Sequence, residues 1–222
     1  MARLYVSILL VFIANACSRN SIDTKQVAQF NEVFTGEKLE VINLGLESFD
    51  LFLQMNFGNI SSERSRIIKF LEVLNDSIFL DQLKFPSQNR SETIIALYEK
   101  TGLRKDYFFY QFEDSVNEEM INANKCNMAL QNEDSLIHFN TTGLYRKALE
   151  NIKTPDSLVI YYTNTIDAVG LISTKTASQG LLYSIKNNNY NIEIAKRIIL
   201  FEFYFELLKS NSKRPSAIKT KN

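Results

Sequence analysis

The sequence predicts an all-α fold, in which a single helical bundle of six to seven helices surrounds a buried C-terminal helix. Residues that make turns are scarce, with seven glycines and three prolines in 222 residues, whereas all-β chains need many turns. Apolar residues recur at spacings of three and four, as in amphipathic helices. The strongest apolar segment, residues 192–208, contains neither glycine nor proline. These observations together favour one helical domain.

The first two predicted helices lie between residues 35 and 75. We expect Thr35 to be the N-cap of the first helix, which ends near Gly58. Its apolar stripe consists of Leu39, Ile42, Leu46, Phe49 and Leu53. A second helix is predicted to start after Ser61 or Ser62 and to end near Asn75. Residues 76–90 then form a loop.

Two further helices are predicted after this loop. The third begins at Ser91, and Gly102 stands where a helix-terminating glycine belongs. The fourth begins at Asp106 and has a stripe of Phe109, Phe112, Val116 and Met120. Residues 122–140 are polar and irregular in pattern.

The remaining helices follow residue 140. A fifth is predicted over residues 141–152, and Thr154-Pro155-Asp156 has the cap, proline and acid that begin a sixth. Residues 173–180 are rich in Thr and Ser, which predicts fraying or a kink in its continuation. Asn191 is expected to cap the helix of residues 192–208.

Residues 192–208 are apolar on most faces, which is typical of a buried helix. A strand is the rival interpretation, since residues 201–206 are aromatic-rich, but the unbroken length favours a helix. Arg197, Glu202 and Glu206 make the segment too charged to span a membrane. The chain shows no repeat of about 33–47 residues, so a solenoid is disfavoured.

The N-terminus has the pattern of a signal peptide. Arg3 precedes an apolar run over residues 4–13, about half of the ~20 residues that cross a bilayer. The run ends at Ala14-Asn15-Ala16-Cys17, which resembles the lipobox of bacterial lipoproteins. The family prefers Leu at the position of Ala14. The resemblance implies cleavage before Cys17, acylation of Cys17 by palmitate-type chains, and anchoring in the bacterial cell envelope, at the periplasmic face or the cell surface.

Two alternatives to lipidation remain open. Ala14-Asn15-Ala16 is also a site for ordinary signal peptidase, which would release a secreted soluble protein, or the segment could stay as an uncleaved anchor. The chain has two cysteines, Cys17 and Cys126. Acylation of Cys17 would leave Cys126 without an intrachain partner, which suits an exported protein that lacks disulfides, whereas a soluble product could bridge the two.

These patterns divide the chain into four parts. Residues 1–16 are the predicted signal peptide, and residues 17–34 are the lipidated cysteine and a tether, with a short helix around residues 26–34 as an alternative. Residues 35–210 form the predicted all-α domain, and residues 211–222 a basic disordered tail.

Composition argues against several classes of function. Acidic and basic residues balance at 25 each, so no net charge attracts nucleic acid. The sequence has no Walker A loop and no Rossmann glycine pattern, so we expect no nucleotide. His138 is the only histidine, which argues against a zinc site. We therefore assign no catalytic residue, no metal and no cofactor.

Two candidate patches fall near the fourth predicted helix. An aromatic patch, a candidate interaction surface, consists of Tyr107, Phe108 and Tyr110. An acidic patch, which could bind Ca²⁺ or share a proton, consists of Glu113, Asp114, Glu118 and Glu119. The plainer interpretations are core packing for the aromatic residues and a solvated helix face for the acidic ones.

Three functions follow as hypotheses. The first is an envelope-anchored, non-catalytic helical lipoprotein that acts through a protein partner or as an accessory subunit. The second is a helical bundle that binds a small apolar ligand, which requires a cavity of roughly a few hundred Å3. The third is a hydrolase that uses acidic residues, which requires two carboxylates in one cleft.

Overall fold

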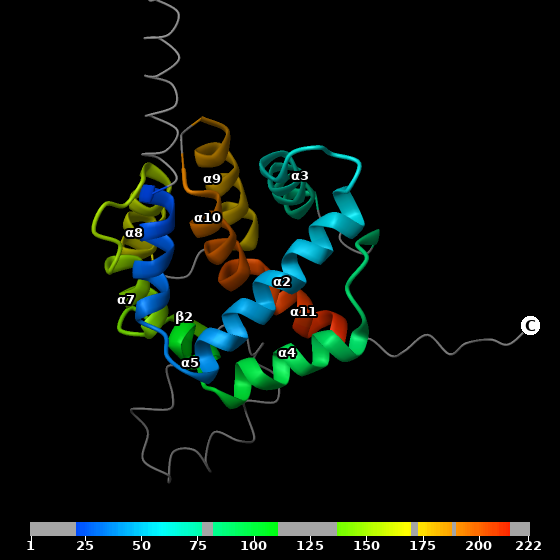
Figure 1. Cartoon of the computed structure of the whole chain (residues 1–222), viewed down its shortest axis with the longest axis horizontal. Coiled ribbons are helices and arrows are strands. Elements are labelled where there is room, and N and C mark those ends of the chain that lie inside the picture. Colours follow the sequence, from blue (N-terminus) through cyan, green and yellow to red (C-terminus); the bar gives the residue numbers. More distant parts are fainter. Residues whose placement is uncertain (1–20, 77–81, 111–136, 170–172, 188–189, 214–222) are drawn as a thin grey trace, which may run out of the picture.

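The computed structural model describes residues 21–76, 82–110, 137–169, 173–187 and 190–213. Within these ranges the fold is all-α apart from one pair of three-residue strands, and the helices pack into one body, which confirms the predicted class (Figure 1). The predicted signal peptide, both cysteines and the acidic patch lie outside the described residues.

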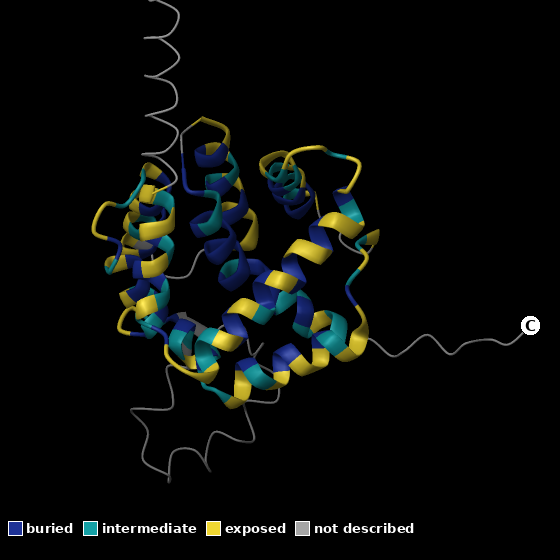
Figure 2. Cartoon of the chain, viewed as in Figure 1, coloured by how far each residue is buried: buried dark blue, intermediate teal, exposed yellow. Residues whose placement is uncertain are grey.

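The C-terminal helix is the core of the molecule. It consists of α10 (Ile192–Ile199), the π-helical turn η4 (Leu200–Tyr204) and α11 (Phe205–Ser212), which follow one another without a break. Almost every residue from Ile194 to Phe205 is buried, as Figure 2 shows for the orange and red helix of Figure 1. The prediction of a buried C-terminal helix is therefore confirmed. The π turn, in which the Phe205 amide donates to the Leu200 carbonyl, was not predicted.

Two helices cover the second half of this core. α2 (Glu37–Phe57) crosses the π turn at Gly45, where an added Cβ would lie 2.9 Å from Leu200 and 3.2 Å from the Phe205 ring. α4 (Gln88–Lys100) packs along α11, and the Tyr98 ring stacks on Phe205 with 4.1 Å between centroids. Gly45 thus allows α2 to approach the central helix closely.

A second pair of helices flanks α10. α3 (Glu63–Asn75) packs against α9 (Thr174–Asn187), and their polar edges are joined by Lys186 and Glu72 at 2.9 Å. The Ser178 hydroxyl also donates to the Asn75 side chain at 2.9 Å. The predicted fraying or kink near residues 173–180 is instead the beginning of a separate helix.

A third group of elements closes the opposite side of the core. It contains α5 (Leu103–Tyr107), α7 (Leu144–Glu150) and α8 (Ser157–Val169). Strand β1 (Phe108–Tyr110) follows α5 and pairs antiparallel with β2 (Ile137–Phe139).

Over its described part, the fourth helix, predicted from Asp106, is helical only at residues 106–107, which end α5. Residues 108–110 form β1 instead, with Phe109 opposite His138 in the ladder. An aromatic run suits a strand, and two further hydrogen bonds hold the segment extended. The Asn140 amide donates to the Tyr107 carbonyl at 2.8 Å, and its side chain donates to the Lys105 carbonyl at 2.7 Å.

The folded body begins before the predicted boundary at residue 35. Residues 21–32 form a helix beside α8, seen in blue in Figure 1, and Phe30 and Phe34 are buried in the core. The Gln29 side chain accepts from the Lys153 amide at 3.2 Å, and its carbonyl accepts from Asn151 at 2.7 Å. Residues 21–34 therefore belong to the domain, where the sequence had suggested a tether.

The helix caps are partly as predicted. Ser62 and Asn191 cap α3 and α10, and Gly102 has the left-handed backbone expected after α4, with φ of 71°. Two expected caps are wrong, since Gly36 precedes α2 in place of Thr35 and Asp156 caps α8 in place of Thr154. The third predicted helix, expected to begin at Ser91, begins earlier as α4, with Ser87 as its cap.

Candidate functional site

The most unusual group in the core is the carboxylate of Glu202, which lies on the π turn. The Tyr162 hydroxyl of α8 donates to Glu202 Oε1, and the Tyr107 hydroxyl of α5 also hydrogen-bonds the carboxylate. The Tyr145 hydroxyl of α7 donates to the Tyr162 hydroxyl at 3.0 Å. We refer to these four residues as the Glu202–tyrosine cluster. It connects the central helix to each of the three helices of the α5–α7–α8 layer.

The local sequence places each member. Tyr107 is the last residue of α5, Tyr145 lies in the first turn of α7, and Tyr162 lies on the buried stripe of α8. Their rings pack edge to face, with Tyr107 and Tyr145 centroids 5.0 Å apart and Tyr145 and Tyr162 centroids 6.5 Å apart. Packing of the rings thus fixes where the hydroxyl groups meet Glu202.

Burial governs the electrostatics of the cluster. The three tyrosines are at most 3% exposed. Glu202 as a whole residue is only partly buried, but its carboxylate lies among these hydroxyl groups. Burial raises the pKa of the Glu202 carboxyl above its ordinary value, although the hydrogen bonds from Tyr107 and Tyr162 act to lower it.

The pKa values of the three tyrosine hydroxyls are raised as well. Burial, and then the negative charge of Glu202, raise the pKa of the Tyr107, Tyr145 and Tyr162 hydroxyls well above the ordinary value. The hydroxyl groups therefore remain protonated and act as hydrogen-bond donors. Within the cluster, the group that can change its protonation at lower pH than these hydroxyls is the carboxyl of Glu202, whose pKa burial raises above its ordinary value. The cluster has the chemistry of a proton-binding site rather than of a metal site.

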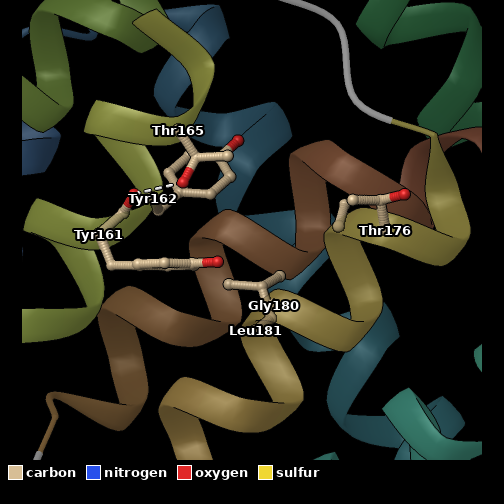
Figure 3. A pocket seen from close by; sticks show the side chains of 7 residues that line it. Tyr161, Tyr162, Thr165, Thr176, Gly180 and Leu181 are labelled. Carbon is tan, nitrogen blue, oxygen red and sulfur yellow. Dashed lines mark hydrogen bonds between the residues drawn. The ribbon is translucent and has the colours of Figure 1, made fainter. Parts of the chain in front are cut away.

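A small cavity lies between α8 and α9. It has a volume of about 30 Å3, and Figure 3 shows Tyr161 and Tyr162 of α8 facing Gly180 and Leu181 of α9 across it. The Tyr161 ring covers Gly180, where an added Cβ would lie 3.3 Å from the ring. This cavity has room for a water molecule or two, and is too small for the apolar ligand considered from the sequence.

Of the aromatic patch predicted from the sequence, the structure describes the side chains of Tyr107 and Phe108. Tyr107 is buried and belongs to the Glu202–tyrosine cluster, so it cannot contribute to an exposed surface. Phe108 is half-buried and packs on the Tyr107 ring at 4.1 Å between centroids. Tyr110 lies in β1, and its side chain is outside the described part.

The other predicted residues give less information. Glu113, Asp114, Glu118 and Glu119 lie outside the described residues, as do Cys17 and Cys126. His138 is in the middle of β2. Among the residues that the structure describes, no group of three or more His, Cys, Asp and Glu side chains is placed to hold a metal ion.

A second polar cluster surrounds Lys196 of α10. Its ammonium lies 2.7 Å from Asp50 of α2, 3.0 Å from Glu63 of α3 and 3.3 Å from Glu193. The Lys196 side chain is 5% exposed, while the three carboxylates are 35–48% exposed. Paired with three acids, it ties α2, α3 and α10 together, and we interpret it as a structural ion cluster.

Neither cluster could be predicted in full from the sequence. Glu202 and Lys196 are charged residues within an apolar helix, which signals a buried charge that needs partners. The partners themselves are separated from Glu202 by 40 residues or more along the chain, and nothing in their spacing links them. Comparisons with protein-family models, with curated proteins and with solved structures find no match.

The central hydrogen bond of the cluster is tested by Tyr162→Phe. The variant removes one donor from Glu202 and the acceptor of the Tyr145 hydroxyl, so we expect the free energy of unfolding to fall by about 2 kcal/mol. Urea unfolding measures the change. Tyr161→Phe is the matched control, since Tyr161 is the neighbouring residue and is 47% exposed. This variant should change the free energy of unfolding by less than about 0.5 kcal/mol. Equal effects of the two variants would contradict the assignment.

Proposed function

We propose that this protein is a non-catalytic lipoprotein of the bacterial cell envelope, held to a membrane by acyl chains on Cys17. The observation that carries the proposal is the sequence Ala14-Asn15-Ala16-Cys17, which follows a positively charged start and a short apolar run. Cleavage before Cys17 would make this cysteine the first residue of the mature protein. Stable anchoring needs about two acyl chains, which a diacylated and N-acylated cysteine supplies.

The position of the domain is consistent with such an anchor. The described helix at residues 21–32 begins four positions after Cys17, so a lipid there would keep the domain within a short distance of the bilayer surface. In the described part of the chain, none of the helices has the length and apolar character to cross a membrane. The domain would lie at the periplasmic face or on the cell surface.

A role through a protein partner, or as an accessory subunit, agrees with how the domain uses its polar groups. The buried carboxylate of Glu202 is occupied by tyrosines of the same chain. The cavity beside α8 has about 30 Å3 and gives no room for a substrate. Under this proposal, the partner binds the outer surface of the domain. The alternatives are a secreted soluble protein, a carrier of a small apolar ligand, and a hydrolase based on the acidic residues at 113–119.

Cell fractionation after Cys17→Ala tests the anchor. We expect the wild-type protein in the membrane fraction and the variant in the soluble fraction, because the variant has no thiol to acylate. Cys126→Ala is the matched control and should remain with the membrane. A soluble wild-type protein, or a Cys17→Ala variant that stays in the membrane, would overturn the proposal.

A crosslinking experiment tests the partner. Crosslinked and affinity-purified wild-type protein from native membranes should carry a recurrent envelope protein. Cys17→Ala should lose that protein if both must share a membrane. Recovery of the wild-type protein with no recurrent crosslinked protein would contradict a function through a partner.

A further inference from the structure

We propose that the Glu202–tyrosine cluster is a proton-sensitive latch, which holds the α5–α7–α8 layer on the central helix when the Glu202 carboxyl group is protonated and loosens it when the proton is lost. The proposal goes beyond the anchoring function and does not depend on it. Its basis is the geometry of one titratable group shared between the central helix and three separate helices.

The contacts converge on one carboxylate. Tyr162 of α8 and Tyr107 of α5 hydrogen-bond Glu202 directly, and Tyr145 of α7 reaches it through the Tyr162 hydroxyl. Tyr98 of α4 acts electrostatically on Tyr107 and Tyr145, but it is not among the groups that act on Glu202 itself. All of these neighbours are neutral phenols. A charge on Glu202 would therefore be balanced by hydrogen bonds alone.

Three charged residues on the same elements form ion pairs with groups other than Glu202. Arg104 of α5 lies 3.7 Å from Glu206, and Arg146 of α7 lies 2.7 Å from Asp167 of α8. Asp106 of α5 pairs with Lys38 at 2.5 Å. In the described part of the chain, the groups that act on the titration of Glu202 are Tyr107 and Tyr162, together with its burial. Among the described residues, no cation is paired with Glu202 in a way that would hold the layer closed at high pH.

The direction of the pH effect follows from linkage. The pKa of the Glu202 carboxyl is raised in the closed structure relative to its ordinary value of 4.5. The closed state then binds more protons than the open state between the ordinary and the raised pKa. The stabilisation of the closed state by this proton is fully present below the ordinary pKa, and it is lost as pH rises through the raised pKa. One proton changes the opening equilibrium by up to about tenfold per pH unit within this window.

The position of Glu202 makes the central helix part of the device. Glu202 lies in the π turn, where the hydrogen bond from Phe205 to Leu200 spans five residues, and π turns within α-helices often lie at functional sites. Phe201, next to it, contacts both Tyr107 and Tyr145. Movement of the carboxylate away from the tyrosines would thus disturb the packing of Phe201 against Tyr107 and Tyr145.

Hydrogen exchange on the mature protein tests the latch with Glu202→Gln, whose amide resembles the protonated acid. We compare amide exchange in α7 and α8 between wild type and variant at each pH from 4.5 to 8.5, so that intrinsic exchange rates cancel. The wild-type-to-variant ratio of exchange rates should rise with pH by up to about tenfold per unit, and then become constant. A ratio that does not change with pH would overturn the proposal.

Two further variants make the test specific. Glu206→Gln, one turn later and partnered with Arg104, should keep the pH dependence of the wild type. If Glu202→Gln does not fold, Tyr107→Phe serves in its place. Loss of a donor to the carboxylate should shift the wild-type transition to higher pH, because the charged form loses a hydrogen bond. A Glu206→Gln variant that abolishes the transition, or a Tyr107→Phe variant that leaves its midpoint unchanged, would refute the latch.

Discussion

Phe201→Ala is expected to lower the free energy of unfolding by about 3–5 kcal/mol, the largest effect of any single substitution that we consider. The Phe201 side chain is fully buried at the π turn. Its ring contacts Tyr145 at 4.4 Å, Phe205 at 5.6 Å, Tyr107 at 5.7 Å and Phe34 at 6.2 Å between centroids. Truncation removes apolar burial and leaves a cavity among four rings that cannot all move to fill it.

Chemical denaturation followed by circular dichroism measures this loss. Tyr183→Ala is the control, because it also truncates an aromatic residue on a helix but at a side chain that is 67% exposed. It should change stability by about 0.5 kcal/mol or less. If Phe201→Ala were as mild as the control, the central helix could not be the core of the fold.

Asn191→Ala is expected to lower the free energy of unfolding by about 2–3 kcal/mol, from the sum of two losses. Asn191 Oδ1 accepts from the Glu193 amide at 3.0 Å and caps α10. Its Nδ2 donates to the Asp23 carbonyl at 2.8 Å and to Gln26 Oε1 at 2.9 Å. The residue is 2% exposed, so its partners lose hydrogen bonds that water cannot readily replace.

Two comparisons separate the cap from the bridge to the N-terminal helix. Ser62→Ala removes an exposed cap from α3 and should cost about 1 kcal/mol. Asn191→Asp keeps the cap but loses both Nδ2 donors, so it should also be clearly destabilising. Thermal and urea unfolding measure all three variants. A cost of Asn191→Ala no greater than that of Ser62→Ala would show that the bridge contributes nothing.

The buried central helix could be predicted because its signal is local. An apolar pattern on most faces over residues 192–208 is typical of a helix that is buried inside the fold. The packing of residues 21–34 could not be predicted in the same way. Phe30 and Phe34 stand among polar residues, and their burial depends on contacts with Tyr145 and Phe201 far along the chain.

The start of α4 shows a similar limit. Ser87 and Ser91 are both good cap residues and lie four positions apart. The structure selects Ser87 because Ser91 is fully buried, where its hydroxyl receives a hydrogen bond from Asn211 at 3.4 Å. The same holds for the Glu202–tyrosine cluster, since four separate elements of the chain must pack before its residues meet. Local pattern therefore predicts which elements form, and tertiary packing decides which polar groups become partners.

The intact mass of the mature protein, extracted from the membranes of the native organism, tests the central claim most directly. We expect a chain that begins at Cys17 and carries the added mass of a diacylglycerol group and an N-linked acyl chain, with fragment ions that place this mass on Cys17. A chain that begins at Cys17 without added mass, or one that retains residues 1–16, would contradict the lipid anchor.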